Sequence, residues 1–384
     1  PDVPTMTQTS PDRIYLDNNA STPIAPEVAA VMRPLLEDHF GNPSSGHWAG
    51  QPAREAVETA RGQIAQLLGC RTDEVLLTSG GSEANNHVIK SVLGPAPRTA
   101  SRTPHVITTA IEHPAVLEPC RVIERFGARV TTVPVDGHGT VDPDDIRRAI
   151  TPQTVLISVM HANNEVGTVQ PVADIGRIAR EHEVTLHTDA AQSVGKIPTR
   201  VDDLGVDLLS IAGHKVYAPK GVGALYVRTG VTLAPLIHGG GHERGQRAGT
   251  ESALLASGLG AACALAVSDP CGERLCAMRE HFWSRLQAAF GDRVVLNGHP
   301  TARLPNTVSI AFPGRFGDEI LATLEGVAAS TGSACHTGIR NMSPVLAAMG
   351  VPDPVAFGTI RFSLGRTSTV AELDDVVRRL ERCV

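Results

Sequence analysis

Glu74-Val-Leu-Leu-Thr-Ser-Gly-Gly-Ser-Glu-Ala-Asn85 is the stretch that decides the fold. Its first half is short and apolar, which is typical of a strand buried on both faces of a sheet. The pair Gly80-Gly81 then predicts a tight turn, and a helix is expected to begin directly after it. A strand joined to a helix by a glycine turn is the repeating unit of α/β proteins.

The same alternation recurs through most of the chain. Other short runs rich in aliphatic or β-branched residues predict buried strands at Val106–Thr109, Val130–Val133, Val155–Val159, Val184–His187 and Leu208–Ile211. Amphipathic segments between the runs predict helices, as at Pro52–Leu68 and Val172–His182. This order predicts a mostly parallel α/β sheet covered by helices on both faces.

The pattern changes after an Ala-rich helical stretch at Ser252–Val267. Helices and strands of a smaller α+β arrangement are expected at Glu273–Phe290, Val294–Leu296, Thr307–Ala311, Asp318–Leu324, Thr359–Ser363 and Val370–Arg382. We therefore expect a large domain over residues 14–265 and a small domain over residues 266–384. Residues 1–13 are expected to pack on the small domain.

Composition and charge exclude several classes of protein. The 384 residues carry 34 Lys and Arg against 40 Asp and Glu, a net charge of −6, with no basic block that would indicate nucleic-acid binding. No apolar run is long enough to span a bilayer, and the first ten residues show no signal peptide. The seven cysteines lack CxxC spacing, which argues against a metal site or a disulfide framework and favours the reducing cytoplasm.

Polar turns follow several of the predicted strands. Thr78–Asn85 directs backbone N–H groups and a helix dipole at one point, which suits a phosphate, and Ser82 adds a hydroxyl. The alternative is an ordinary turn in which Ser82 caps the helix, and this stretch alone does not decide between the two. Glu112-His-Pro114 and Asn163-Asn-Glu-Val-Gly167 are similar turns. His113 is a candidate for ring stacking or proton transfer, and its alternative is a structural histidine.

Two charged residues follow other strands. Asp189 suits a protonated ring nitrogen such as that of pyridoxal phosphate, and its alternative is a helix N-cap. Lys215 suits an amine nucleophile whose pKa desolvation has lowered, and its alternative is a solvated surface lysine. Taken singly, each residue favours the structural alternative. Taken together, five polar turns at the carboxyl edge of one sheet predict a single site.

Further motifs accompany these turns, including Tyr15-Leu-Asp-Asn-Asn-Ala20, Gly41-Asn-Pro-Ser44, His187-Thr-Asp-Ala-Ala-Gln192, His238-Gly-Gly-Gly-His-Glu-Arg244, Gly249-Thr250, Ser330-Thr-Gly-Ser-Ala-Cys335 and Ile360-Arg-Phe-Ser-Leu-Gly365. From about residue 13 to residue 380 the set resembles the NifS/IscS-type cysteine desulfurases, which are fold-type I homodimers that depend on pyridoxal phosphate. The resemblance implies a mostly parallel seven-stranded sheet in the large domain and a smaller α+β domain.

The resemblance also implies roles for individual residues. Lys215 matches the lysine that binds the cofactor covalently and shuttles protons, Asp189 faces the pyridinium nitrogen, and His113 stacks on the ring. The other implied cofactor ligands are Gln192, Asn164, Gly81, Ser82, His214 and Thr250, the last reaching the phosphate of the second subunit.

Substrate and sulfur chemistry are assigned in the same way. Arg361 matches the arginine that binds the substrate carboxylate, Asn164 lies near the substrate, and Cys335 matches the nucleophile. The implied reaction converts L-cysteine to L-alanine and leaves a persulfide on Cys335 for an acceptor protein. Small residues around Cys335 predict a mobile loop over Thr331–Met342.

The chain departs from the family pattern at Ala212, where many members have a serine that donates to the phosphate. The sequence ends at Val384, soon after its last predicted helix, so docking of an iron–sulfur scaffold through the C-terminal tail of many IscS proteins is not expected. Other functions to be distinguished are a selenocysteine lyase, an aminotransferase-like activity and a non-catalytic scaffold in a sulfur relay. The acceptor remains open among iron–sulfur assembly, tRNA thiolation and DNA phosphorothioation.

Overall fold

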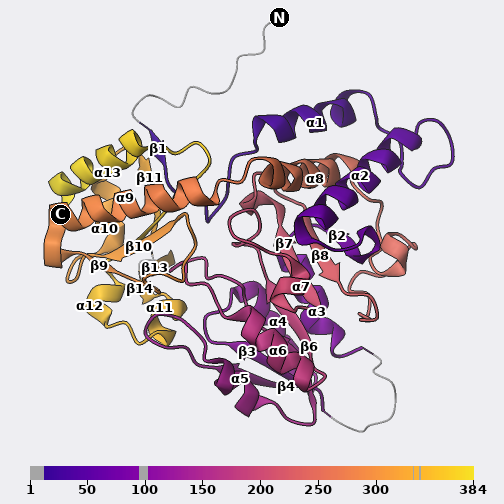
Figure 1. The fold of residues 1–384 in the computed structure, drawn as a ribbon, viewed down its shortest axis with the longest axis horizontal. Helices are drawn as coiled ribbons and strands as arrows, with labels where there is room; N and C mark the ends of the chain where they lie inside the picture. The colour runs from indigo at the N-terminus through magenta and orange to yellow at the C-terminus, as the bar shows by residue number, and fades with distance from the viewer. Residues whose placement is uncertain (1–12, 95–102, 332, 337–338) are drawn as a thin grey trace, which may run out of the picture.

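The computed structural model describes residues 13–94, 103–331, 333–336 and 339–384, without the side chains of residues 332–340. Two sheets, each with its own hydrophobic core, organise most of the described chain (Figure 1). The expected packing of the N-terminal segment concerns residues that, up to residue 12, lie outside the described part. The domain boundary near residue 266 stays a prediction.

The larger sheet has seven strands, as the resemblance implied. Its strand order is β2 (Val75–Thr78), β8 (Gly223–Val227), β7 (Leu208–Ala212), β6 (Thr185–Asp189), β5 (Thr154–Ser158), β3 (His105–Thr109) and β4 (Arg129–Val133). Strand β8 runs antiparallel to both neighbours, and the other pairs are parallel, which confirms the mostly parallel sheet. The six expected strands are present within two residues at each end, and β8 was not among them.

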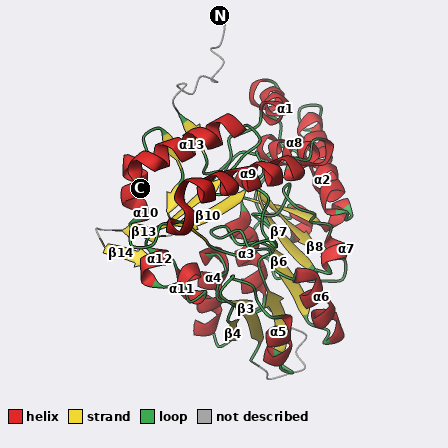
Figure 2. Cartoon of the chain, turned by 60° about the vertical axis from the view of Figure 1, so that its left-hand side comes forward, coloured by secondary structure: helices red, strands yellow, loops and turns green. Residues whose placement is uncertain are grey.

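Helices cover both faces of this sheet (Figure 2), as predicted. One face packs on α1 (Pro26–Glu37), α2 (Gln51–Leu68), α5 (Pro143–Ala149), α6 (Val172–Glu181), α7 (Val201–Leu204) and α8 (Ala253–Ser268). The other face packs on α3 (Gly81–Ser91) and α4 (Pro114–Arg125). Within β7, Leu208 joins the α3/α4 side while Leu209 joins the opposite core, so consecutive apolar residues are all buried.

The smaller sheet has four antiparallel strands in the order β12 (Ser330–Thr331), β15 (Thr359–Ser363), β10 (Thr307–Ala311) and β9 (Val295–Leu296). It packs on α9 (Gly272–Phe290), α10 (Gly317–Thr323) and α13 (Val370–Cys383). Phe282 and Phe362 meet edge to face in this core, with ring centroids 5.4 Å apart. Strand β1 (Ile14–Tyr15) pairs with β11 (Val327–Ala328), so Ile14 packs into this second core.

The predicted loop around Cys335 contains a short hairpin. Strand β13 (Ser333–His336) pairs antiparallel with β14 (Ile339–Met342), and Cys335 lies opposite Arg340 in the backbone register. Two short helices follow, α11 (Pro344–Ala348) and α12 (Asp353–Ala356). Both contribute to a separate apolar cluster with residues that follow β3 and β5 of the large sheet, which fixes the end of the hairpin relative to that sheet.

No single described helix is long and apolar enough to cross a membrane; only α8 and the bent segment after it, Gly272–Arg293, meet the length and composition when taken together.

Candidate active site

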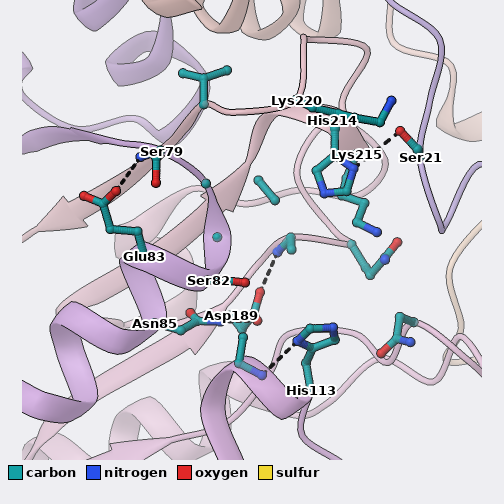
Figure 3. A pocket seen from close by; sticks show the side chains of 18 of the residues that line it. Ser21, Ser79, Ser82, Glu83, Asn85, His113, Asp189, His214, Lys215 and Lys220 are labelled. Atoms are coloured by element: carbon teal, nitrogen blue, oxygen red, sulfur yellow. Dashed lines mark hydrogen bonds between the residues drawn. The ribbon is translucent and has the colours of Figure 1, made fainter. Parts of the chain in front are cut away.

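A cavity of about 530 Å³ opens where five strands of the large sheet end. Figure 3 shows side chains that line it, among them His113, Asp189 and Lys215. Its walls come from the turns after β2, β3, β5, β6 and β7, so the five polar turns meet as the sequence predicted. Eight of the eleven predicted site residues line it: Gly81, Ser82, His113, Asn164, Asp189, Gln192, His214 and Lys215. The roles assigned to them stay predictions.

Lys215 ends the short 3₁₀ turn Gly213–Lys215 that follows β7. This turn is tight, because a Cβ on Gly213 would lie 2.9 Å from the carbonyl oxygen of Val222. Lys215 Nζ donates to the carbonyl oxygens of Asn19 and Ala20, at 2.7 Å each. Burial, followed by the positive charge of Arg361, lowers its pKa to about 8. The side chain is therefore a partly desolvated amine and not a surface lysine.

Asp189 is the last residue of β6 and is 7% exposed. Its Oδ2 accepts a hydrogen bond from Asn85 Nδ2 at 2.7 Å, and its Oδ1 accepts one from the backbone N–H of Ala191 at 2.9 Å. Asn85 lies in α3, so the carboxyl group is fixed from two elements. Asn85 Oδ1 is buried and has no partner within the described structure.

His113 both caps α4 and lines the cavity. Its Nδ1 accepts the backbone N–H of Ala115 at 3.0 Å, so the proton of the neutral ring is on Nε2. Burial lowers the His113 pKa against the opposing effect of Asp189, and Lys215 lowers it further. The capping contact uses Nδ1 and leaves Nε2 available, so it is compatible with the functional role, which stays a prediction.

The turn into α3 forms another wall of the cavity. Gly80 has φ +152°, and helix α3 begins at Gly81, so Ser82 lies in its first turn and is not the N-cap. The alternative interpretation of Ser82 as a cap is therefore wrong. The first amides of a helix lack intrahelical acceptors, and the first two residues of α3, Gly81 and Ser82, both line the cavity.

His214 and Ala212 lie beside this turn. His214 Nδ1 is 3.4 Å from Ser21 Oγ, and burial together with the charge of Lys215 lowers the His214 pKa to about 4. The imidazole is therefore neutral near pH 7. Ala212 lines the cavity, and a Cβ on Gly81 would lie 3.1 Å from the Ala212 methyl group.

Arg361 projects from β15 and does not line the cavity, but it contacts a residue that does. Its Nη1 donates to the carbonyl oxygen of Asn164 at 2.9 Å, and its Nη2 donates to Asp17 Oδ1 at 2.7 Å. Arg361 is 8% exposed, and its Nε is buried without a partner in the described structure. The same Asn164 carbonyl accepts from Asn19 Nδ2 at 3.1 Å, which joins the two sheets at the site.

Comparison with known proteins agrees with this geometry. Residues 14–376 match the family described as aminotransferase class-V. Cysteine desulfurase IscS of Dictyoglomus turgidum is 47% identical over 375 residues, which cover 97% of this chain and 94% of that protein. The chain belongs to the cysteine desulfurases of the class-V aminotransferase family.

Solved structures give the same result. A NifS-like protein superimposes with a TM-score of 0.88 at 37% identity, covering 96% of this chain and 98% of that one. SspA in complex with cysteine superimposes with a TM-score of 0.81 at 39% identity, covering 91% of this chain and 98% of that one. The fold-type I architecture expected for a cysteine desulfurase is confirmed.

Among the described side chains, two predicted site residues of this cysteine desulfurase do not line the cavity, Arg361 and Thr250. Thr250 is exposed and follows the 3₁₀ turn Glu243–Gly245. The side chain of Cys335 lies outside the described residues, so its position relative to Lys215 stays a prediction. The hairpin that carries it is held at both ends: Ser330 Oγ donates to Asp17 Oδ1 at 2.8 Å, and Ser343 Oγ donates to Glu165.

Sequence reasoning missed three residues that organise the site, namely Asp17, Asn19 and Asn85. Each lies inside a motif that supported the resemblance, in Tyr15–Ala20 or Thr78–Asn85, but none had a role assigned. Their polar side chains beside apolar runs were the available signal. Their partners lie far away along the chain, so spacing could not identify them.

Proposed function

We propose that this chain binds pyridoxal phosphate and transfers the sulfur of L-cysteine to Cys335, releasing L-alanine. The observation that supports this most directly is Lys215, an amine with a pKa of about 8 that faces a cavity also lined by Asp189 and His113. These groups suit a ring with a basic nitrogen and a reactive carbonyl.

The residues that line the cavity match the chemical groups of pyridoxal phosphate. The first turn of α3, with Gly81 and Ser82, offers amides and a hydroxyl to a phosphate. Asp189 offers a fixed carboxylate to a protonated ring nitrogen, and Lys215 offers an amine for covalent attachment. When bound, the cofactor would withdraw electrons from the substrate Cα and Cβ.

The chain's own residues supply the proton steps. Lys215 Nζ, which loses its proton near pH 8, is the proposed base for the Cα proton of the substrate. His113 holds a proton on Nε2 because Nδ1 is occupied by the Ala115 amide. Nε2 is therefore the atom through which His113 would exchange a proton with substrate or cofactor.

Arg361 is the proposed partner of the substrate carboxylate. A guanidinium presents five N–H groups in a planar fork, and the Nε of Arg361 has no partner among the described residues. Because Arg361 is buried and has an unused donor, it should bind a carboxylate more tightly than a neutral group. This selects α-amino acids and supports L-cysteine as substrate.

Cys335 is the proposed sulfur acceptor. Attack of its thiolate on the substrate sulfur forms an S–S bond and breaks the substrate C–S bond, whose electron pair stays on Cβ. A proton taken up at Cβ and one returned to Cα complete alanine. The hairpin base is tied through Asp17 to Arg361 and through Glu165 to the turn that contains Asn164. Those ties support delivery of Cys335 to the substrate side of the cavity.

A homodimer is also proposed, with Thr250 serving the cavity of the second subunit. Thr250 is exposed in the single chain. The segment after α1 exposes Phe40 by 83% and Trp48 by 81%, and large exposed aromatic groups of this kind are typical of protein interfaces.

The acceptor of the sulfur is proposed to be a protein, and iron–sulfur assembly, tRNA thiolation and DNA phosphorothioation remain its candidate pathways. The relative named cysteine desulfurase IscS supports sulfur transfer from cysteine and does not name the acceptor. Six cysteines in the described chain are free thiols, which supports the proposed cytoplasmic location.

The deciding experiment is a single turnover with L-cysteine. Purified enzyme reconstituted with pyridoxal phosphate is mixed with one equivalent of L-cysteine, alkylated and digested. We expect one equivalent of alanine and one of persulfide on the peptide that contains Cys335. Cys335→Ser should retain the visible absorbance of the cofactor and form neither product, and Cys383→Ser is the matched control. Alanine formation at the wild-type rate by Cys335→Ser would refute the assignment.

Selenocysteine lyase is the second candidate. Rates with L-cysteine and L-selenocysteine distinguish the two, and a lyase would act on selenocysteine alone.

A further inference from the structure

A buried lysine lies directly behind the cavity and has no role in the steps above. Lys196 follows β6 in the turn that also contains Gln192, and it is 8% exposed. Its Nζ donates to the carbonyl oxygen of Gln192 at 2.9 Å and lies 3.4 Å from Gln192 Oε1. Both contacts are to the same residue, and that residue lines the cavity.

No acidic side chain in the described part of the chain pairs with Lys196. Across the described residues its hydrogen bonds go to amide oxygens and to no carboxylate. The charged groups facing it are Lys215 and Arg361, opposed by the Cys271 thiol, and burial with these cations lowers its pKa to about 7. A buried amine without an acidic partner costs stability. Because burial of Lys196 does not stabilise the fold, its two contacts with Gln192 point to a role in the site.

Gln192 is held at both ends of its amide. Oε1 faces Lys196, while Nε2 donates to the carbonyl oxygen of Asn19 at 3.0 Å. The same Asn19 oxygen accepts from Lys215 Nζ at 2.7 Å. Because Nε2 carries two hydrogens, one remains for a group inside the cavity. An amide turned by 180° would present an oxygen acceptor there instead.

We propose that Lys196 is a positioning residue that locks the Gln192 amide with its donor end toward the cavity, where it serves an anionic ring oxygen of the cofactor. The inference rests on the proposed function, because the ring oxygen belongs to pyridoxal phosphate. Lys196 does not touch the cofactor and acts through Gln192. It thereby adds a hydrogen-bond donor to a wall of the cavity that also carries Lys215.

The test measures binding of pyridoxal phosphate to cofactor-free protein by absorbance. Lys196→Met keeps the length of the side chain and removes its donors. We expect its dissociation constant to rise about tenfold, the effect of one hydrogen bond. The urea midpoint of the cofactor-free variant should not fall, because a buried charge has been replaced by an apolar group. Lys90→Met, on α3, is the matched control and should bind as the wild type does.

A double-mutant cycle separates positioning from simple packing. Gln192→Leu removes the amide, and adding Lys196→Met to it should not weaken binding further. An added tenfold loss in the double variant would overturn the proposal, as would wild-type binding by Lys196→Met.

If Lys196→Met does not fold, the variant Gln192→Glu tests the proposal instead. Its carboxylate would pair with Lys196 and present an oxygen to the cavity, so pyridoxal phosphate should bind more weakly than to Gln192→Leu. Equal or tighter binding would overturn the proposal. Failure of the wild-type chain to bind pyridoxal phosphate would instead refute the proposed function.

Discussion

Arg361 Nη2 lies 2.7 Å from Asp17 Oδ1, and this contact joins the small sheet to the segment that leads into the large one. Both side chains are largely buried, at 9% and 19% exposure. Asp17 Oδ1 also accepts from Ser330, which lies in the strand before the Cys335 hairpin. One carboxylate therefore links the proposed substrate-binding arginine to the proposed nucleophile segment.

Asp17→Ala should destabilise the protein. It leaves the buried guanidinium with the Asn164 carbonyl as its remaining described acceptor, and removal of one partner of a buried pair costs about 3–5 kcal/mol. L-alanine should then raise the melting temperature more in the variant than in the wild type, because its carboxylate replaces Asp17. Asp269→Ala, which removes an exposed carboxylate from its pair with the partly buried Arg366, is the control and should cost under about 1 kcal/mol. A loss no larger than this control would contradict the prediction.

The pKa of Lys215 predicts the pH dependence of cofactor attachment. Only the neutral amine attacks a carbonyl, and the folded-state pKa is lowered from 10.5 to about 8. The rate of reconstitution should therefore rise about tenfold per pH unit below pH 8 and level off above it. Stopped-flow absorbance of cofactor-free protein measures the rate, with Lys215→Ala as the blank. A rate that keeps rising toward pH 10.5 would mean that Lys215 is an ordinary solvated lysine.

Most of the large sheet could be predicted because its strands are buried on both faces and read as apolar runs. Strand β8 was missed although its run, Gly223–Val227, is equally apolar. It follows β7 after a short connection and pairs antiparallel with it, which does not fit the strand–helix alternation on which the prediction rested. Strand boundaries shifted by one or two residues, as at Glu74, which belongs to a 3₁₀ turn.

The site residues that could be predicted are those that directly follow a predicted strand. His113, Asp189 and Lys215 reach the cavity because parallel strands bring their carboxyl ends to one edge. Contacts such as Asp17 with Arg361 depend on how the two sheets pack, and the residues are separated by 344 positions. No local pattern encodes such a separation. Lys196 was missed for a different reason: it lies four positions after Gln192, but its apolar neighbours in sequence give no sign that its amine is buried against that residue.

Ala212 gives a prediction of increased affinity. Its methyl group lies beside Gly81 at the start of α3, where a phosphate is proposed to bind. Ala212→Ser would add one donor there, and the dissociation constant of pyridoxal phosphate should fall about fivefold, in line with about 1 kcal/mol for one hydrogen bond. Ala162→Ser, at another alanine of the cavity, is the control and should leave it unchanged. Unchanged binding by Ala212→Ser would separate this residue from the phosphate.

The exposed aromatic residues predict the behaviour of the proposed dimer. Trp48→Glu should weaken self-association at least 30-fold, since a large aromatic group at an interface contributes about 2 kcal/mol or more. Light scattering across a dilution series measures the oligomeric state. Phe126→Glu is the matched control, because Phe126 is 73% exposed at the end of α4, away from the segment that holds Trp48. A wild-type chain that is monomeric at micromolar concentration would refute the dimer.

The buried pair of Arg61 and Glu243 anchors the segment that leads to Thr250. Arg61 Nη1 donates to Glu243 Oε2 at 2.8 Å, and the backbone N–H of Leu77 donates to the same oxygen at 3.0 Å. The two side chains are 5% and 1% exposed, so solvent cannot replace a lost partner. Glu243 and Arg244 also have φ of +49° and +56°, a conformation that non-glycine residues adopt at a cost.

Glu243→Ala should therefore lower the free energy of unfolding by about 3–5 kcal/mol in urea titrations, because it removes the buried partner of the Arg61 guanidinium and leaves it the Val75 carbonyl and the exposed carboxylate of Glu58, 3.4 Å from Nε. Arg61→Met combined with Glu243→Leu should recover much of that loss, since apolar groups replace both charges. Arg71→Ala, which breaks the exposed pair with Asp73, provides the control near zero. If Glu243→Ala lowered the free energy of unfolding by less than about 1 kcal/mol, the Arg61–Glu243 pair would not anchor this segment to β2. The strain at Glu243 and Arg244 would then need another source of support.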